Sequence, residues 1–221
     1  MEWRCEGIFL SARLLGEKNL LACLWTESKG LVRGMLPKGR GQPQMGSRVS
    51  VSWKGRSEND LGWFTLEGLP SSYLLLCLDL PDALSHLQSL CHLLSRVLPE
   101  HHPYPSLYQG FLKVLQNLPL ETGGMVRAHF QVALLEALGY GLDLACCAVT
   151  GTRDNLTHVS PKSGRAVCHR EALPYENRLL PLPVFLRNPE DIALPAPADL
   201  DAAFRLTDFF IRRHLLNSEG A

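Results

Sequence analysis

Apolar and polar positions alternate in short runs along the first 70 residues, a pattern typical of β-strands. Within residues 47–54, the side chains of Val49, Val51 and Trp53 point one way and those of the intervening serines point the other. Similar short runs occupy residues 5–15, 19–26, 30–36 and 62–69, separated by turns that contain glycine. Five short strands at this spacing predict a small antiparallel barrel or sheet.

After Pro70 the apolar spacing becomes that of helices. Helices are expected near residues 81–97, 106–118, 125–138 and 199–216, and the first three should pack on one another. Pro81 suits a first turn, and Gly139 should end the third helix. The expected apolar faces are Leu84, Leu87, Leu90, Leu94 and Val97; Leu107, Phe111, Leu115 and Leu118; Phe130, Leu134, Leu135 and Leu138; and Leu200, Phe204, Phe209 and Leu215.

The pattern therefore predicts an α+β chain in two domains. A barrel would occupy residues 1–78 and a helical domain residues 79–221, with an irregular, glycine- and proline-rich region at 142–187. The longest apolar run, about residues 73–78, is far short of the roughly 20 residues that a membrane helix needs. The first residues show no export signal, so a cytoplasmic protein is expected.

The positions of the charged residues along the chain are more informative than the net charge. The 22 basic and 22 acidic residues cancel, which excludes a uniformly basic nucleic-acid coat. Residues 29–56, however, hold seven cations and no acid, and a second basic excess falls in 146–187. The seven are Lys29, Arg33, Lys38, Arg40, Arg48, Lys54 and Arg56. A glycine-rich loop within this stretch would let backbone amides approach phosphates. The stretch is therefore a candidate surface for binding nucleic acid. The simpler interpretation is an ordinary charged face exposed to solvent.

Motifs for catalysis are absent or incomplete. The segment 34–41 resembles a phosphate-binding loop but has Arg40 and Gly41 where the chemistry needs Lys and Ser or Thr. His101 and His102 lie in a proline-rich connector with no identifiable partner, and a solvated loop is the favoured interpretation. Trp53 shares a strand face with valines, which favours core packing over base stacking but leaves both open.

The seven cysteines are an odd number and mostly lie in apolar stretches, which favours free thiols in a reducing compartment. Cys147 and Cys168 stand where a zinc knuckle would begin each Cys-x-x-Cys pair, but Thr150 and Glu171 replace the second ligands. The chain is expected to bind no metal, with Cys147 and Cys168 as weak candidates; zinc remains the alternative.

Two sets of segments resemble the RecO family of bacterial recombination mediators, in its alphaproteobacterial branch. The first set is Glu6-Gly-Ile-Phe-Leu-Ser11, Lys29-Gly-Leu-Val-Arg-Gly34 and Lys38-Gly-Arg40. The second is Leu138-Gly-Tyr-Gly-Leu-Asp-Leu144, Cys147-Ala-Val-Thr-Gly151, the run from Val159 to Val167 and Arg178-Leu-Leu-Pro-Leu-Pro183. The resemblance covers most of the chain in the family's order.

The resemblance implies an N-terminal OB-fold barrel, a helical domain with a degenerate zinc-knuckle-like insertion, and no enzymatic activity. It further implies DNA repair through the RecF pathway, near the nucleoid: binding of single- and double-stranded DNA, strand annealing, and help in loading RecA on strands coated by single-strand-binding protein. Expected partners are DNA, RecR and the acidic C-terminal tail of single-strand-binding protein.

The expected DNA contacts are the seven cations of residues 29–56 together with Lys162, Arg165 and Arg178, which could instead meet the acidic tail. A protein–protein adaptor with little DNA binding is the main alternative, and a zinc-dependent enzyme is a third.

Overall fold

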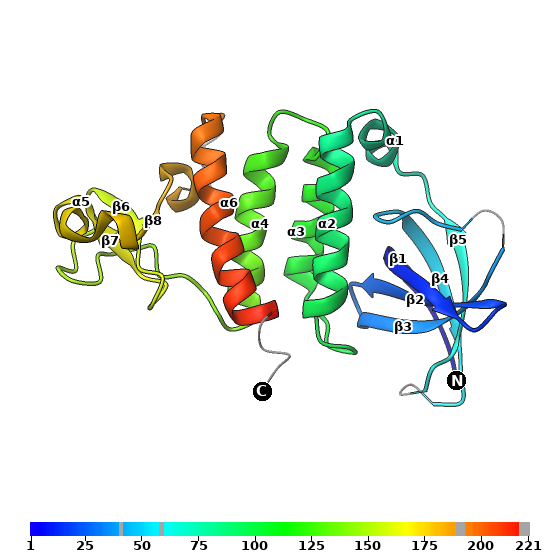
Figure 1. Cartoon of the computed structure of the whole chain (residues 1–221). Helices are drawn as coiled ribbons and strands as arrows, with labels where there is room; N and C mark the ends of the chain where they lie inside the picture. Colours follow the sequence, from blue (N-terminus) through cyan, green and yellow to red (C-terminus); the bar gives the residue numbers. More distant parts are fainter. Residues whose placement is uncertain (40–41, 58–59, 189–192, 217–221) are drawn as a thin grey trace. The chain divides into compact units, whose positions relative to one another are not determined.

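The computed structural model describes residues 1–39, 42–57, 60–188 and 193–216 (Figure 1). By contacts between residues, the chain divides into two compact units, Met1–Pro119 and Leu120–Ala221. Within the described ranges, no helix is both long and apolar enough to cross a membrane.

The first unit begins with a closed five-stranded barrel, drawn from blue to cyan in Figure 1. Its strands are β1 (Glu2–Leu15), β2 (Asn19–Thr26), β3 (Gly30–Pro37), β4 (Arg48–Lys54) and β5 (Trp63–Gly68). They follow one another around the barrel in the order β1-β2-β3-β5-β4, and β4 closes onto β1. All pairs are antiparallel except β3 with β5, which is the mixed arrangement of an OB-fold. The expected five-stranded OB-fold barrel is therefore confirmed.

Alternation of side chains builds the barrel core. Val49, Val51 and Trp53 are at most 3% exposed, whereas Lys54 beside them is exposed. They join inward residues of the other four strands, among them Phe9 and Phe64, in one apolar cluster. Core packing of Trp53 is thus confirmed.

Three helices complete the first unit: α1 (Ser72–Leu78), α2 (Pro81–Val97) and α3 (Pro105–Asn117). Pro81 occupies the first turn of α2, as expected. The predicted face of α3 is buried throughout, and the buried residues of α2 include Leu87, Leu90 and Leu94. Helix α1 is an element that the sequence did not predict; its Tyr73 hydroxyl donates a 2.8 Å hydrogen bond to the Gly46 carbonyl of the barrel.

The second unit contains two packed helices and a small sheet. Helix α4 (Gly123–Ala137) ends before Gly139, as predicted, and packs on α6 (Pro197–Ile211). Between them the chain forms β6 (Leu156–Val159), β7 (Ala166–Cys168) and β8 (Leu180–Pro181), in the order β7-β6-β8. Short turns of helix follow: α5 (His169–Ala172), η1 (Leu173–Arg178), η2 (Val184–Arg187) and the π turn η3 (Arg212–Leu216).

Three sequence expectations differ from this structure. Residues 142–187 hold a sheet where only irregular chain was expected. An antiparallel barrel was expected, but β3 and β5 pair in parallel. Helix α4 packs on α6 within the second unit, and its expected packing on the two preceding helices stays a prediction. The predicted α6 face was wrong: Ala203, Leu206 and Phe210 are buried, while Phe209 is 37% exposed. Apolar residues surround this helix, so spacing alone allowed either face.

The domain boundary at residue 78 stays a prediction. The change from strands to helices falls between β5 and α1, but the contacts keep α1, α2 and α3 with the barrel.

Candidate nucleic-acid interface

One group of cations lies on loops at the ends of the barrel strands. Lys38 follows β3, and its backbone N–H donates a 2.8 Å hydrogen bond to the carbonyl of Lys18 in the β1–β2 turn. Both lysine side chains are exposed, so this end of the barrel carries two cations whose backbones are hydrogen-bonded to each other. Lys18 was missed because it lies outside the acid-free stretch; only the hairpin pairing brings it beside Lys38. Arg40 lies outside the described residues.

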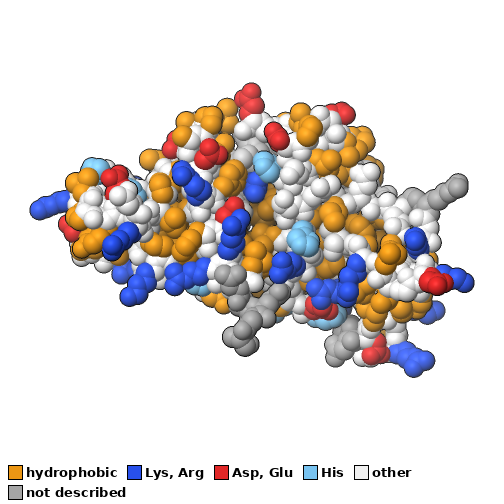
Figure 2. Space-filling view, in the orientation of Figure 1, with side chains coloured by type: hydrophobic (Ala, Val, Ile, Leu, Met, Phe, Trp, Pro, Cys, Tyr) orange, Lys and Arg blue, Asp and Glu red, His pale blue; other side chains and the backbone are white. Residues whose placement is uncertain are grey.

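Lys54 and Arg56 mark another part of the barrel. Lys54 pairs with Glu2 in the first half of β1, whereas Lys38 lies beside the turn that follows β1. The side chains of Lys54 and Arg56 are exposed, and among the described residues neither has a carboxylate within 4 Å. The cations of residues 29–56 that the structure describes are therefore spread around the barrel, and Figure 2 shows basic and acidic side chains interspersed on the face in view.

Two of the predicted barrel cations are engaged in ion pairs. Arg33 on β3 contacts the Glu100 carboxylate and donates to the carbonyl of Ser95 at 3.0 Å. Arg48 on β4 donates to Glu6 at 2.7 Å. Both pairs are partly exposed, so each is worth about 0–1 kcal/mol. They nevertheless reduce the positive field that these two arginines offer to a phosphate chain.

The aromatic residues of the barrel take distinct positions. Trp25 is fully buried against Tyr108 and Phe111 of α3, with ring centroids 5.4 and 5.6 Å away. Trp53 is buried, and Trp3 stacks on it at 5.7 Å with an interplanar angle of 10°. Trp3 is only partly buried, so part of its ring is accessible to a base, unlike that of Trp53.

The second unit brings a further basic cluster together. Lys162 and Arg165 lie on the turn before β7, where Arg165 pairs with Asp143 at 3.3 Å. Arg213, beyond α6, donates to the carbonyl of Pro161 and so joins this turn. Arg178 is exposed on η1. Arg213 was missed because a cation at the end of a helix is already accounted for by the helix dipole.

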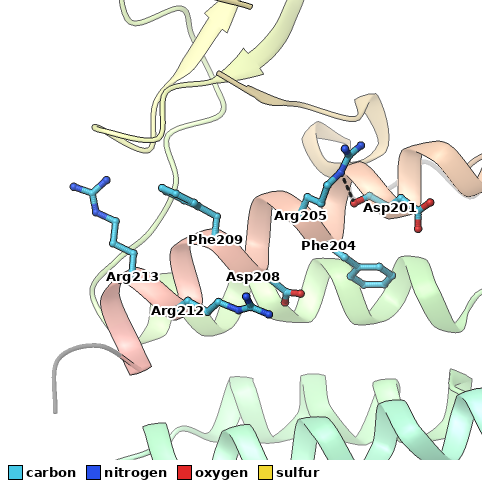
Figure 3. A pocket seen from close by; sticks show the side chains of 7 residues that line it. All are labelled: Asp201, Phe204, Arg205, Asp208, Phe209, Arg212 and Arg213. Carbon is cyan, nitrogen blue, oxygen red and sulfur yellow. Dashed lines mark hydrogen bonds between the residues drawn. The ribbon is translucent and has the colours of Figure 1, made fainter. Parts of the chain in front are cut away.

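A groove of about 900 Å³ runs along α6 (Figure 3). Arg205, Phe209 and Arg213 are spaced four residues apart and project to one side of the helix. Asp201 and Asp208 line the same groove beside Arg205 and Arg212. An exposed aromatic ring between arginines suits a partner that offers carboxylates and an apolar side chain.

A buried polar network fixes α6 on α4. The Thr207 hydroxyl donates to Gln131 at 3.0 Å, and Gln131 donates to Asp208 at 3.1 Å. Arg127 stacks over Phe204 at 4.4 Å. Burial lowers the pKa of Arg127, while Asp208 opposes that shift. This network fixes the rotation of α6 about its own axis, and in that orientation Phe209 lies at the surface.

The knuckle-like turn holds two thiols in a fixed arrangement. The Cys168 N–H donates to Cys147 Sγ at 3.3 Å, and Thr150 Oγ1 lies 3.9 Å from Cys168 Sγ. The described residues contain no group of three or more His, Cys, Asp or Glu placed to hold a metal ion. A structural zinc site needs four nitrogen or sulfur ligands, and a threonine hydroxyl in place of the second cysteine does not fit it. The expectation that the chain binds no metal stays a prediction.

We expect Cys147 to titrate well below Cys23 and Cys91. Burial alone would raise its pKa, but hydrogen bonds from the Thr150 hydroxyl and from the backbone N–H groups of Thr150, Cys168 and Val149 outweigh burial and lower the pKa from 9.0 to about 6. Burial raises the pKa of Cys23 to about 11 and that of Cys91 to about 12.

Ultraviolet thiolate absorbance should therefore rise near pH 6, and Cys147→Ser should remove that rise. The depressed pKa also adds stability that is present above the unfolded thiol's pKa and is lost as the pH falls through about 6. An unchanged rise in Cys147→Ser would contradict this assignment.

Together the OB-fold barrel, the exposed loop cations and the basic cluster of the second unit are typical of the class of proteins that bind nucleic acid or acidic partners. Comparison with known proteins narrows the class. Residues 1–69 match the family model "Recombination protein O N terminal" and residues 79–220 match "Recombination protein O C terminal".

Similar curated proteins carry the name DNA repair protein RecO. The chain is 41% identical to the one from Agrobacterium fabrum, covering 100% of this chain and 88% of that protein. It is also 41% identical to those of Chelativorans sp. (100% and 90%) and Brucella abortus (97% and 88%). The chain belongs to the RecO family, whose members are DNA repair proteins that act as recombination mediators without catalysing a reaction.

Proposed function

We propose that this protein binds single- and double-stranded DNA through phosphate contacts, anneals complementary strands and helps to load RecA on strands coated by single-strand-binding protein. The observation that carries the proposal is the OB-fold barrel whose loops present exposed Lys18, Lys38, Lys54 and Arg56. Such cations hold a strand without reading its bases, because they contact only phosphates.

Annealing follows from charge screening. Two complementary strands repel each other through their phosphates, and cations that neutralise part of this charge let the bases meet without nucleotide hydrolysis. Each unit has its own basic surface: the barrel loops in one, and Lys162, Arg165 and Arg213 in the other. A strand bound at each surface would bring two strands to the same molecule.

The expected protein partners are RecR and the acidic C-terminal tail of single-strand-binding protein, with RecA served indirectly. The α6 groove supports the second partner, since Arg205 and Arg213 offer positive charge on either side of the exposed ring of Phe209. Lys162, next to the residue that Arg213 contacts, extends the same positive surface.

We expect removal of three barrel cations to weaken DNA binding and its salt dependence. Lys38→Ala, Lys54→Ala and Arg56→Ala together should reduce affinity for an oligothymidylate about tenfold or more and lower the salt slope by about 2. Fluorescence anisotropy across a salt series measures both quantities.

The matched control removes three exposed cations elsewhere: Lys113, Arg153 and Arg170. It changes the net charge equally, so a purely global effect of charge would appear in both variants. Equal behaviour of the two triple variants would contradict the site on the barrel.

A protein–protein adaptor with little direct DNA binding is the second candidate. The engagement of Arg33, Arg48 and Arg165 in intramolecular ion pairs favours it, because these cations are partly neutralised. Annealing of complementary oligonucleotides coated with single-strand-binding protein separates the two functions: the mediator accelerates annealing, and the adaptor does not.

A further inference from the structure

A small pocket opens on the barrel where the start of β1, the β2–β3 turn and the connector after α2 meet. The residues that line this aromatic pocket include Trp3, Lys29, Val32, Arg33, Trp53 and His101. Its volume is about 180 Å³, room for about six waters at about 30 Å³ each. That is well below the 300–1,000 Å³ of drug-sized sites, so the pocket suits a single flat ring.

The walls of the pocket are fixed before any ligand arrives. Trp53 is held beneath Trp3 by Gly55 and Gly62, where a Cβ atom would overlap the Trp53 ring. On the opposite side, the connector is tied to β3, because the His101 N–H donates a 2.9 Å hydrogen bond to the Leu31 carbonyl. His101 itself has φ +58°, a conformation that non-glycine residues adopt at some cost. A preformed pocket binds a ring with little loss of side-chain entropy.

The chemistry of the lining points to a nucleobase with a neighbouring phosphate. The stacked indoles of Trp3 and Trp53 offer aromatic surface, which attracts bases of any identity. Lys29 lines the same pocket and offers a cation to a phosphate. Arg33 lines the pocket as well, where it contacts Glu100.

We propose that the aromatic pocket binds one unpaired base of a single DNA strand, stacked on Trp3, with Lys29 at the adjacent phosphate. This inference rests on the proposed DNA binding and adds to it a contact that only unpaired bases can make. It gives the barrel a preference for single strands that phosphate contacts alone do not provide.

The test compares an oligothymidylate of about 15 nucleotides with an abasic strand of equal length, which has the same phosphates but no bases. The wild-type chain should bind the oligothymidylate more tightly. Trp3→Ala should weaken that binding between about fivefold and 150-fold and leave the abasic strand unaffected. Trp3→Phe should keep most of the preference, since a phenyl ring still stacks. Trp63→Ala, which removes a 44% exposed tryptophan outside the pocket, should change neither affinity.

A second measurement is independent of how Trp3→Ala folds. A 2-aminopurine base in the strand should lose fluorescence on binding, because stacking quenches it, and the loss should persist in Trp63→Ala. Absence of quenching, or equal weakening of both strands by Trp3→Ala, would overturn the pocket while DNA binding stands. Failure of the wild-type chain to bind either strand would overturn the proposed function itself. A free mononucleotide that binds as tightly as the strand would overturn the assignment to a strand.

Discussion

Trp25→Ala is expected to lower the free energy of unfolding of the first unit by about 3–5 kcal/mol. The Trp25 side chain has no exposed surface and packs against Tyr108 and Phe111, so its removal leaves a cavity between the barrel and α3. All four tryptophans lie in the barrel, so the remaining three report its unfolding by fluorescence in a urea titration.

Two controls separate packing from other effects. Trp25→Phe should cost much less, because it keeps an aromatic ring and removes a buried indole N–H that has no hydrogen-bond partner among the described residues. Trp63→Ala should cost little, since that ring is 44% exposed. A Trp25→Ala variant as stable as Trp63→Ala would mean that α3 does not pack on the barrel as described.

Gly30→Ala should be the next most damaging of these changes, at about 3 kcal/mol. Gly30 has φ +70°, and a Cβ atom there would overlap the backbone carbonyl of His102. That contact holds the connector beside β3, where the aromatic pocket is formed. Chemical denaturation should therefore show lower stability, and binding of single strands should weaken as well.

Gly16→Ala is the matched control for this change. Gly16 has nearly the same φ, +69°, but nothing lies within 4 Å of its Cβ position. It should cost only the conformational strain, about 1 kcal/mol. Equal losses in the two variants would show that backbone strain, and not contact with the connector, accounts for the effect of Gly30→Ala.

The ion pairs change which cations matter for the proposed function. Sequence analysis treated the seven cations of residues 29–56 as one stretch, but Arg33 and Arg48 are held by Glu100 and Glu6. Glu100 is 67 residues from Arg33, so no local pattern could reveal that pair. Conversely, Lys18 and Arg213 join basic clusters only because a hairpin turn and a helix end bring them there.

The pattern of apolar and polar residues predicted the elements well wherever one face of an element is buried and the other is exposed to solvent. The alternation around Val51 and the spacing around Phe111 each place apolar side chains on a single face, so the interior side can be recognised without a partner. The same reasoning failed for α6, where apolar residues lie on several faces. There the network of Gln131, Thr207 and Asp208 selects the buried side and leaves Phe209 exposed.

By itself, the sequence determined that this chain forms a five-stranded barrel followed by helices, because strand and helix periodicities depend only on neighbouring residues. Its motifs also indicated the RecO family. Tertiary structure alone decided that Trp53 is core and Trp3 is available, that α1 lies on the barrel side of the chain, and that Cys147 and Cys168 share one turn. These outcomes depend on burial and on contacts between residues far apart in the sequence, and the free energy of such contacts is set by the folded surroundings.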